Sequence, residues 1–448
     1  MMKKLLLCLP LILVGLASAQ EAVPRTYFGM IMHCCAINGT AKHDSQPWPP
    51  APFGSIRLWD SGTYWLKIEP GPNSYDWEVL DSWLEKAKQH NQEVLYVFGG
   101  IPDWASGDKN DPKCKDQAFK MAGSCHPPAD LNEDGSGTNQ TFKDFATALV
   151  KHAKGRISYY EVWNEPMNMF YWSGNPRQMV RVTQDLRDIV KSIDPDAGIV
   201  SPGTGWLDDH PEKANYAWNP TIWTAQYLEA GGGKYIDALA THAYLKGTCP
   251  SGGWDLDQIE VRTEPFLKMM KKNGIADKPL WSTEGSWGPV AERKATCVTD
   301  PDMQVAFVAQ YHIAMWAAGY KRVYWYAWND KDVGSLLDRN EMGPTAAGKA
   351  YAYVIDWMVG ATLKGCDKNK AEWKCTFSRP DGSQYLAIWD GAQACSGGSC
   401  ATTPVKVDAA YTDYLDLAGG KTKIANNTVP VGLKPIWLEA PAAGSKRK

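Results

Sequence analysis

Short runs of β-branched and aromatic residues alternate along positions 25–360 with longer segments whose apolar residues recur at helical spacing. Strands that alternate with helices are typical of a parallel sheet, and eight such units favour a closed barrel over an open sheet. We therefore predict an α/β fold, a (β/α)8 or TIM barrel. Its expected strands are Tyr27–Met32, Ser55–Trp59, Glu93–Phe98, Ile157–Trp163, Gly198–Ser201, Ile236–Thr241, Leu280–Thr283 and Arg322–Ala327.

The segments between these strands carry the signals of helices. Residues 80–87 place apolar side chains three and four positions apart, which predicts one buried face. Asn175-Pro176 supplies a cap and a first-turn proline for another helix, and Asn273-Gly274 ends a third. The first unit is the exception, because residues 46–52 contain four prolines and cannot form a regular helix.

The pattern changes after a helical segment at 348–358. Residues 361–440 are rich in Thr, Gly and Cys, and apolar positions alternate with polar ones along much of this stretch. This alternation predicts a small antiparallel, β-sandwich-like accessory domain after a catalytic barrel at 20–360. The tail, 441–448, is expected to be disordered.

The N-terminal residues have the pattern of a secretory signal peptide. A basic start is followed by the apolar run Leu5–Leu16 and by Ala-Ser-Ala, and this run is too short to span a bilayer. We expect cleavage after Ala19, which removes residues 1–19 and leaves a secreted chain without a membrane anchor. The net charge of -3 gives no support to nucleic-acid or membrane-surface binding.

The cysteines indicate disulfides. There are eleven, one of them (Cys8) in the signal peptide, so an even number remains in an exported chain. The pairing of the adjacent Cys34 and Cys35 is left open. The expected pairs are Cys114–Cys125, Cys366–Cys375, Cys395–Cys400 and Cys249–Cys297.

Two glutamates follow expected strands at the barrel's carboxyl edge, where such folds build their active sites. The fourth strand ends in Asn164-Glu165-Pro166 and the seventh in Thr283-Glu284. A carboxylate at the end of an apolar strand is costly unless it is paired or functional. Retaining glycoside hydrolysis needs two carboxylates about 5–5.5 Å apart, one acting as acid/base and one as nucleophile. Ion-paired rim glutamates are the structural alternative, and the presence of both at these two strands favours catalysis.

These motifs resemble clan A of the glycoside hydrolases. Arg57-Leu-Trp-Asp60 in the second strand and Gly-Gly-Ile-Pro-Asp-Trp-Ala-Ser at 99–106 look most like family 39. The resemblance implies that Glu165 is the acid/base, that Glu284 is the nucleophile, and that Asn164 binds the 2-hydroxyl of the sugar. For this chemistry Glu165 needs the higher pKa, which a nearby ionised Glu284 would raise.

The same resemblance implies a supporting ring of residues. Arg57 would hold Glu284 in its ionised form, and Tyr244 would contact the same carboxylate. His33 and His242 end the first and sixth strands and are candidates for contact with the sugar. A buried, merely hydrogen-bonded side chain is the alternative for His33.

Aromatic residues near the expected mouth are candidates for stacking on sugar rings, because flat rings suit the apolar faces of sugars. The chain has 21 tryptophans, but a large core also takes up tryptophan, so composition by itself is only a hint. Packing inside the protein is the alternative for each candidate. The candidates are Trp104, Trp287, Trp325 and Trp328.

Metal or cofactor chemistry is not predicted. The eight histidines are scattered, and the expected reaction needs no cofactor. Residues 130–135, Asp-Leu-Asn-Glu-Asp-Gly, match the beginning of an EF-hand calcium loop, but Thr141 stands where the bidentate glutamate belongs. Asx turns in an ordinary loop explain this segment equally well.

The expected function is retaining hydrolysis of a polysaccharide or oligosaccharide. Loop tryptophans and the insertion Pro102–Gln140 favour endo cleavage. If the insertion instead closes one end of the cleft, the enzyme is exo-acting, like a β-xylosidase or an arabinosidase. A non-catalytic carbohydrate-binding protein is the alternative from another class. Trp373 or Trp389 are candidates for glycan binding by the β domain, but its alternating pattern already needs these rings to form a core, which favours a structural role. Sugar, linkage and oligomeric state are left open by the sequence.

Overall fold

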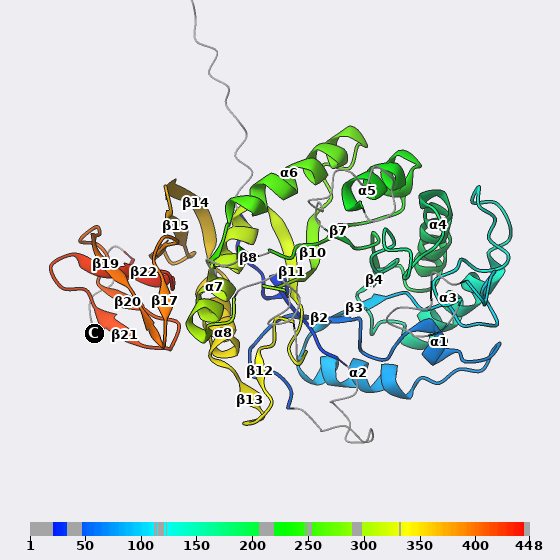
Figure 1. The fold of residues 1–448 in the computed structure, drawn as a ribbon, viewed down its shortest axis with the longest axis horizontal. Coiled ribbons are helices and arrows are strands. Elements are labelled where there is room, and N and C mark those ends of the chain that lie inside the picture. Colours follow the sequence, from blue (N-terminus) through cyan, green and yellow to red (C-terminus); the bar gives the residue numbers. More distant parts are fainter. Residues whose placement is uncertain are drawn as a thin grey trace, which may run out of the picture.

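The structure, a computed structural model, describes residues 21–33, 47–111, 114, 121, 123–205, 219–245, 247–248, 253–288, 298–330 and 333–442. Nine parallel strands curl into a barrel at the centre of the molecule (Figure 1). They are β1 (Phe28–Ile31), β2 (Ser55–Leu58), β3 (Glu93–Val97), β4 (Tyr159–Glu161), β5 (Gly198–Val200), β6 (Thr204–Gly205), β7 (Leu239–His242), β10 (Leu280–Gly285) and β11 (Tyr320–Trp325).

The sheet has the order β5-β4-β3-β2-β1-β11-β10-β7-β6, and its two ends meet. Val200 of β5 forms a bridge with Ala238, the residue before β7, while Thr204 of β6 pairs with Thr241 in β7. Strands β5 and β6 are thus two parts of one strand position. The barrel therefore closes with eight strand positions, which confirms the predicted fold class.

Helices cover the outside of the barrel. Most follow a strand directly, and within residues 47–54 no helix occurs before β2, as the proline-rich segment predicted. Asn175 caps α4 by accepting from the N–H groups of Arg177 and Gln178, and Gln178 closes a capping box. The helices are α1 (Trp65–Ile68), α2 (Glu78–Gln89), α3 (Gln140–Ala153), α4 (Pro176–Ile193), α5 (Pro220–Glu229), α6 (Asp257–Lys272), α7 (Pro301–Ala317) and α8 (Ala346–Met358).

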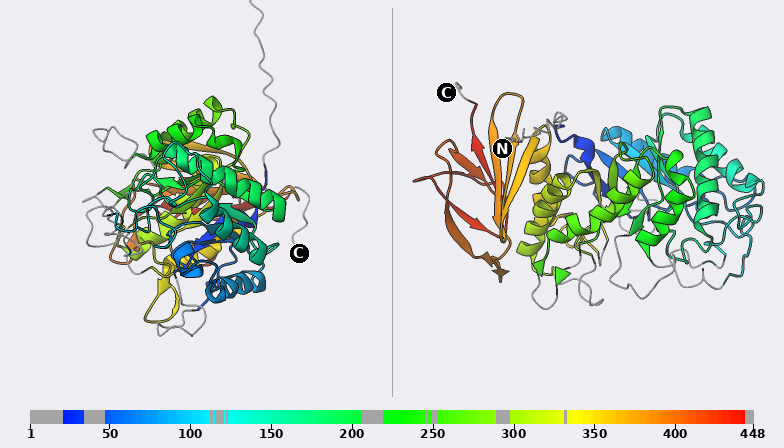
Figure 2. Two further views of the ribbon diagram at one scale, coloured as in Figure 1. Left: turned by 90° about the vertical axis from the view of Figure 1, so that its right-hand side faces the viewer. Right: turned by 90° about the horizontal axis from the view of Figure 1, so that it is seen from above.

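The C-terminal part is antiparallel. Its larger sheet has the order β14-β15-β16-β23-β20-β21, and Figures 1 and 2 show it at one end of the molecule, against α7 and α8. Trp437 stacks on Trp357 of α8 with ring centroids 5.7 Å apart. The strands of the larger sheet are β14 (Thr362–Asn369), β15 (Glu372–Ser378), β16 (Gln384–Asp390), β20 (Asp413–Leu415), β21 (Lys421–Lys423) and β23 (Ile436–Ala440). A separate two-stranded sheet pairs β19 (Thr402–Lys406) with β22 (Thr428–Gly432).

Short hairpins complete the described structure. They are β8 (Gly247–Thr248) with β9 (Gly253–Trp254), β12 (Leu337–Asp338) with β13 (Gly343–Pro344), and β17 (Cys395–Ser396) with β18 (Ser399–Cys400).

Three of the expected disulfides are formed, with S–S distances of 2.07, 2.09 and 2.08 Å: Cys114–Cys125, Cys366–Cys375 and Cys395–Cys400. Cys34, Cys35, Cys249 and Cys297 lie outside the described residues, as do the expected signal peptide and residues 443–448. Among the helices in the described part of the chain, none combines the length and the apolar character needed to cross a membrane.

Candidate active site

A cluster of charged side chains lies at the carboxyl edge of the barrel. Its floor is a separate apolar cluster to which seven barrel strand positions contribute, including Ile31, Leu95 and Trp281. Successive strand residues point to opposite faces, so Glu161, His242 and Thr283, each two positions beyond a member of this floor on β4, β7 and β10, share its interior face. Together with Arg57 of β2, they place polar residues from four strands beside buried apolar side chains.

Arg57 of β2 is the centre of the cluster and is fully buried. Its Nη1 donates to Oε1 of Glu284 at 2.7 Å, and its Nη2 donates to Oδ1 of Asn164 at 2.8 Å. The other side of the guanidinium holds Glu161, with Nε to Oε2 at 2.6 Å and Nη2 to Oε1 at 3.2 Å. Our sequence reasoning missed Glu161, although a glutamate inside an apolar strand was a visible signal.

Glu284 is the residue before the last one of β10 and is buried. Besides Arg57, it accepts a hydrogen bond from the Tyr244 hydroxyl at 2.8 Å. Burial raises the pKa of this carboxyl above its usual value, while His242, Arg57 and the Tyr244 hydroxyl act in the opposite direction. The contacts of Arg57 and Tyr244 are those that the resemblance implied.

Glu165 lies across the cluster from Glu284. Its φ of 42° is in the left-handed region, which is uncommon for a residue with a side chain and concentrates at functional sites. One carboxylate oxygen accepts from Asn168 Nδ2 at 2.7 Å, and the other is 2.8 Å from Nδ1 of His242. Burial raises the pKa of Glu165 to about 7, with Asp60 adding to the effect and Arg57 opposing it. Burial is thus the main cause, where the sequence had suggested proximity to Glu284.

His242 of β7 lies between the two carboxylates. Its Nδ1 is 2.8 Å from Glu165 and 3.5 Å from Oε2 of Glu284. One oxygen of each glutamate and one ring nitrogen of His242 all lie within 4.8 Å of one another. Burial lowers the pKa of His242 to about 4, so the ring is neutral near pH 7. Gly203 makes this packing possible, because a Cβ there would lie 2.4 Å from both Oε1 of Glu161 and Nε2 of His242.

A second group of polar residues lies beside the cluster, and the sequence analysis found only His33 of it. Asp60 accepts from the hydroxyls of Tyr64 at 2.7 Å and Tyr326 at 2.6 Å. His33 lies 3.8 Å from Asp60 and 3.4 Å from Asp330. Tyr326 is half-buried next to Trp325, and it places an aromatic ring between His33 and Tyr244.

Three of the four tryptophan candidates are placed differently from the prediction. Trp325, Trp287 and Trp328 are 0%, 1% and 2% exposed, so packing in the core contradicts their expected stacking on sugar rings. Trp325 donates to the carbonyl of Gly334, and Trp328 donates to that of Pro47. Trp104 is half-buried, packs edge-on against Trp65 and donates to the carbonyl of Glu69. Alternation along a strand end does not reveal whether a ring points into the core or into the mouth.

The loop that begins with the calcium-like segment is held by hydrogen bonds from a side chain of the protein. The guanidinium of Arg181 donates to the carbonyls of Gly135, Gly137 and Thr138. One oxygen of Asp130 accepts from the N–H groups of Gln140 and Thr141. These contacts describe an ordinary capped loop held by an arginine.

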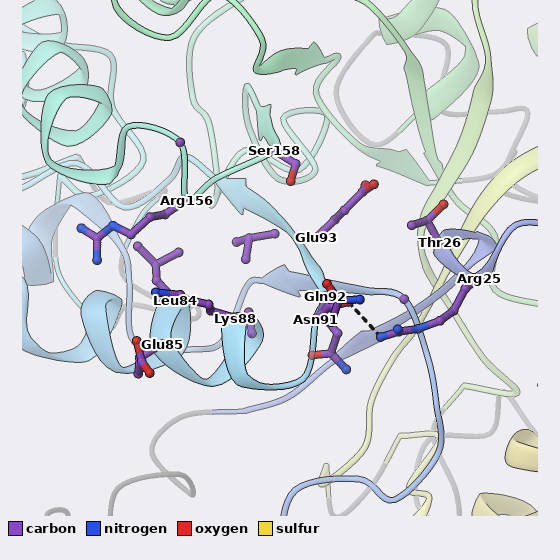
Figure 3. A pocket seen from close by; sticks show the side chains of 14 residues that line it. Arg25, Thr26, Leu84, Glu85, Lys88, Asn91, Gln92, Glu93, Arg156 and Ser158 are labelled. Carbon is purple, nitrogen blue, oxygen red and sulfur yellow. Dashed lines mark hydrogen bonds between the residues drawn. The ribbon is translucent and has the colours of Figure 1, made fainter.

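A hollow of about 780 Å³ lies at the other end of the barrel (Figure 3). Its lining residues include Gly54, Glu93 and Ser158, which stand at or just before the amino ends of β2, β3 and β4. Arg25 crosses it and donates to the carbonyls of Phe53 and Asn91. Residues at this end of a barrel usually contribute to stability and not to catalysis, so the polar cluster at the carboxyl edge remains the candidate site.

Solved structures that resemble this chain include several glycoside hydrolases. A family 39 glycoside hydrolase from the gut symbiont Bacteroides cellulosilyticus has a TM-score of 0.65 and 17% identity, covering 93% of this chain and 81% of that one. A family 39 β-xylosidase from Caulobacter crescentus has a TM-score of 0.61 and 13% identity, covering 95% and 98%. A glucosidase from Croceicoccus marinus has a TM-score of 0.60 and 14% identity, covering 93% and 95%.

No protein-family model matches the sequence, and no curated protein matches it either. At these identities, the structural likeness establishes a shared fold. The fold is that of the group to which the motifs of the sequence pointed, family 39 included.

Proposed function

We propose that this protein is a retaining glycoside hydrolase, with Glu165 as the acid/base and Glu284 as the nucleophile. The observation that carries the proposal is the approach of the two glutamates, with one oxygen of each within 4.8 Å. Retaining enzymes hold their carboxyl groups about 5–5.5 Å apart, whereas inverting enzymes need about 6.5–9.5 Å for a water molecule. The spacing supports direct attack by a carboxylate on the sugar.

The two glutamates differ in the way that this chemistry requires. Glu165 has a pKa raised to about 7, so at and below neutral pH it retains a proton for the leaving oxygen. Glu284 receives hydrogen bonds from Arg57 and Tyr244, both of which favour its anion. Asn164, held by Arg57, is the proposed partner of the sugar's 2-hydroxyl.

The reaction has two steps. In the first, Glu284 attacks the anomeric carbon while Glu165 gives its proton to the departing oxygen, which leaves a glycosyl ester on Glu284. In the second, Glu165 takes a proton from water, and the resulting oxygen nucleophile displaces Glu284 from the same carbon. Two inversions give retention, and both glutamates return to their starting states.

We also propose a secreted enzyme that acts on an oligosaccharide or polysaccharide. The N-terminal residues and the three disulfides support secretion. The argument for endo cleavage rested on the insertion Pro102–Gln140 and on loop tryptophans, of which Trp287 is buried and Trp104 half-buried. Product size is therefore the measurement that separates endo from exo action.

The test compares wild type with Glu284→Ala and Glu165→Gln on plant and bacterial polysaccharides and on aryl glycosides. We expect hydrolysis by wild type and a loss of about 10⁴-fold or more in Glu284→Ala, as for other residues that form the covalent bond. Azide added to Glu284→Ala should restore cleavage of an activated aryl glycoside and give the azide of inverted configuration. Full activity of Glu284→Ala would refute the assignment.

A further inference from the structure

Glu161 is a fully buried carboxylate directly beneath the two proposed catalytic glutamates. It is the last residue of β4, four positions before Glu165. It accepts two hydrogen bonds from Arg57 and one from the Thr283 hydroxyl at 3.0 Å. Its Oε1 also lies 4.0 Å from Nε2 of His242.

A buried ion pair of this kind contributes little to the stability of the fold. The cost of removing both charges from water largely cancels their attraction, and apolar residues of the same volume often serve as well. Replacing Gly203, the residue that leaves space for Glu161 and His242, would disturb both groups at once. The geometry therefore points to a role in the site above.

The charges of the cluster show what that role is. Arg57 is its one guanidinium among the described residues, and it is shared by the two carboxylates Glu161 and Glu284. The Arg57–Glu161 pair is neutral, so ionised Glu284 carries one negative charge in excess. Without Glu161, Arg57 and Glu284 would neutralise each other, and Glu165 would face a less negative site.

We propose that Glu161 is a positioning residue of the reaction, which orients Arg57 toward Glu284 and Asn164 and offsets the charge of Arg57 so that Glu165 keeps its proton. This inference rests on the proposed function. In this role Glu161 does not touch a reacting atom. It acts through Arg57 and through Nε2 of His242, the ring nitrogen on the side away from Glu165.

The other groups that face Glu165 set the background for this effect. Asn168 donates to it, His242 is neutral near pH 7, and Arg57 and Asp60 act in opposite directions. Tyr171 and Tyr326 also lie near the carboxylates, and burial raises the pKa of both hydroxyls, which stay protonated. Removing the carboxylate of Glu161 changes the charge of the cluster and leaves the hydrogen bonds of Glu165 with Asn168 and His242 in place.

The test is the pH dependence of kcat/KM for Glu161→Gln, which keeps the shape and removes the charge. We expect the basic limb to move to lower pH by about one unit, since the charge of Arg57, no longer offset by Glu161, lowers the pKa of Glu165. We also expect kcat at pH 7 to fall about tenfold while KM changes little. Glu161→Asp keeps the charge and should restore the basic limb.

Glu93→Gln is the matched control. Glu93 is 2.6 Å from Arg322 at the opposite end of the barrel, so this variant loses an Arg–Glu pair far from the site. It should lower the Tm and leave the pH profile unchanged. If Glu161→Gln is insoluble, Thr283→Val removes one donor from the same carboxylate and should move the basic limb in the same direction by less.

The outcomes are distinct. A pH profile of Glu161→Gln, or of Thr283→Val in its place, that superimposes on the wild type would overturn the role of Glu161, which would then be structural only. If wild type cleaves no glycoside, or if Glu165→Gln and Glu284→Ala match it, the proposed function fails before Glu161 is tested.

Discussion

Glu165 and Glu284 show how one site gives two carboxylates different states. The side chain of Glu165 is 20% exposed and that of Glu284 is 7% exposed, and burial raises the pKa of each. Glu284 is compensated by Arg57 and Tyr244, whereas Glu165 has a direct hydrogen bond from the neutral amide of Asn168. This unequal compensation fits the proposed roles of Glu165 as proton donor and Glu284 as nucleophile.

The pH profile follows from this difference. With the pKa of Glu165 at about 7, kcat/KM for a substrate with a poor leaving group should fall as the pH rises through about 7. In Glu165→Gln the basic limb should disappear for an aryl glycoside whose leaving group needs no proton. The measurement is kcat/KM between pH 4 and 9 for both proteins. A basic limb that persists in Glu165→Gln would assign the proton donor to another group.

The same pKa predicts an effect on stability. The folded chain keeps the Glu165 proton from the ordinary pKa of 4.5 up to about 7, while the unfolded chain releases it. Wild type should therefore lose stability as the pH rises across this window, by at most about 3 kcal/mol. Glu165→Gln should unfold at higher denaturant concentration than wild type at pH 8 and at a similar one at pH 4. If wild type unfolded at a higher denaturant concentration than Glu165→Gln at pH 8, this prediction would be contradicted.

At the scale of elements, the site depends on where parallel strands end. Strands β2, β4, β7 and β10 each deliver one or two polar residues to the same edge. The connection between β5 and β6 contributes a residue without a side chain, Gly203, against Glu161 and His242. The close approach of this connection helps to leave Glu161 and His242 only 0% and 1% exposed.

Gly203→Ala tests this packing. Its Cβ would meet Glu161 and His242 at 2.4 Å, so we expect a loss of about 1–3 kcal/mol in stability, as for overpacked cores, and a fall of tenfold or more in kcat. Chemical unfolding and steady-state kinetics measure the two effects. Gly71→Ala is the control, since nothing lies within 4 Å of a Cβ there. If Gly203→Ala changed neither stability nor kcat, the connection between β5 and β6 would be shown to move aside at little cost.

At the scale of the molecule, α7 and α8 join the barrel to the C-terminal sheet. Helix α7 is buried on all sides from Val305 to Trp316. In α8, Tyr351 donates to the carbonyl of Gly29 in β1, and Trp357 stacks on Trp437 of β23. A continuous core therefore runs from the barrel into the sheet, which supports a structural role for the proposed β domain. Trp389, once a candidate for binding sugar, is 0% exposed and stacks on Trp373.

This continuity predicts a single unfolding transition. Trp437→Ala should cost about 3–5 kcal/mol, as for large aromatic residues in cores, and should lower the Tm of the whole chain. Scanning calorimetry, with activity followed on heating, measures both. Lys406→Ala on exposed β19 is the control. Two separate transitions in Trp437→Ala, with the barrel unchanged, would contradict one continuous core.

The sequence by itself determined the order of strands and helices and the residues that end the strands. These depend on local periodicity, which is why the eight strand positions, Glu165 and Glu284 could be identified before any contact was known. Only the tertiary structure decided which charges meet. Arg57 meets Glu161 and Glu284, which are 104 and 227 residues away along the chain. Asp60 meets Tyr326, which is 266 residues away. None of these pairings has a local signal in the sequence. Trp287, Trp325 and Trp328 were misjudged for the same reason, because closure of the barrel, not spacing along a strand, decides which rings are covered.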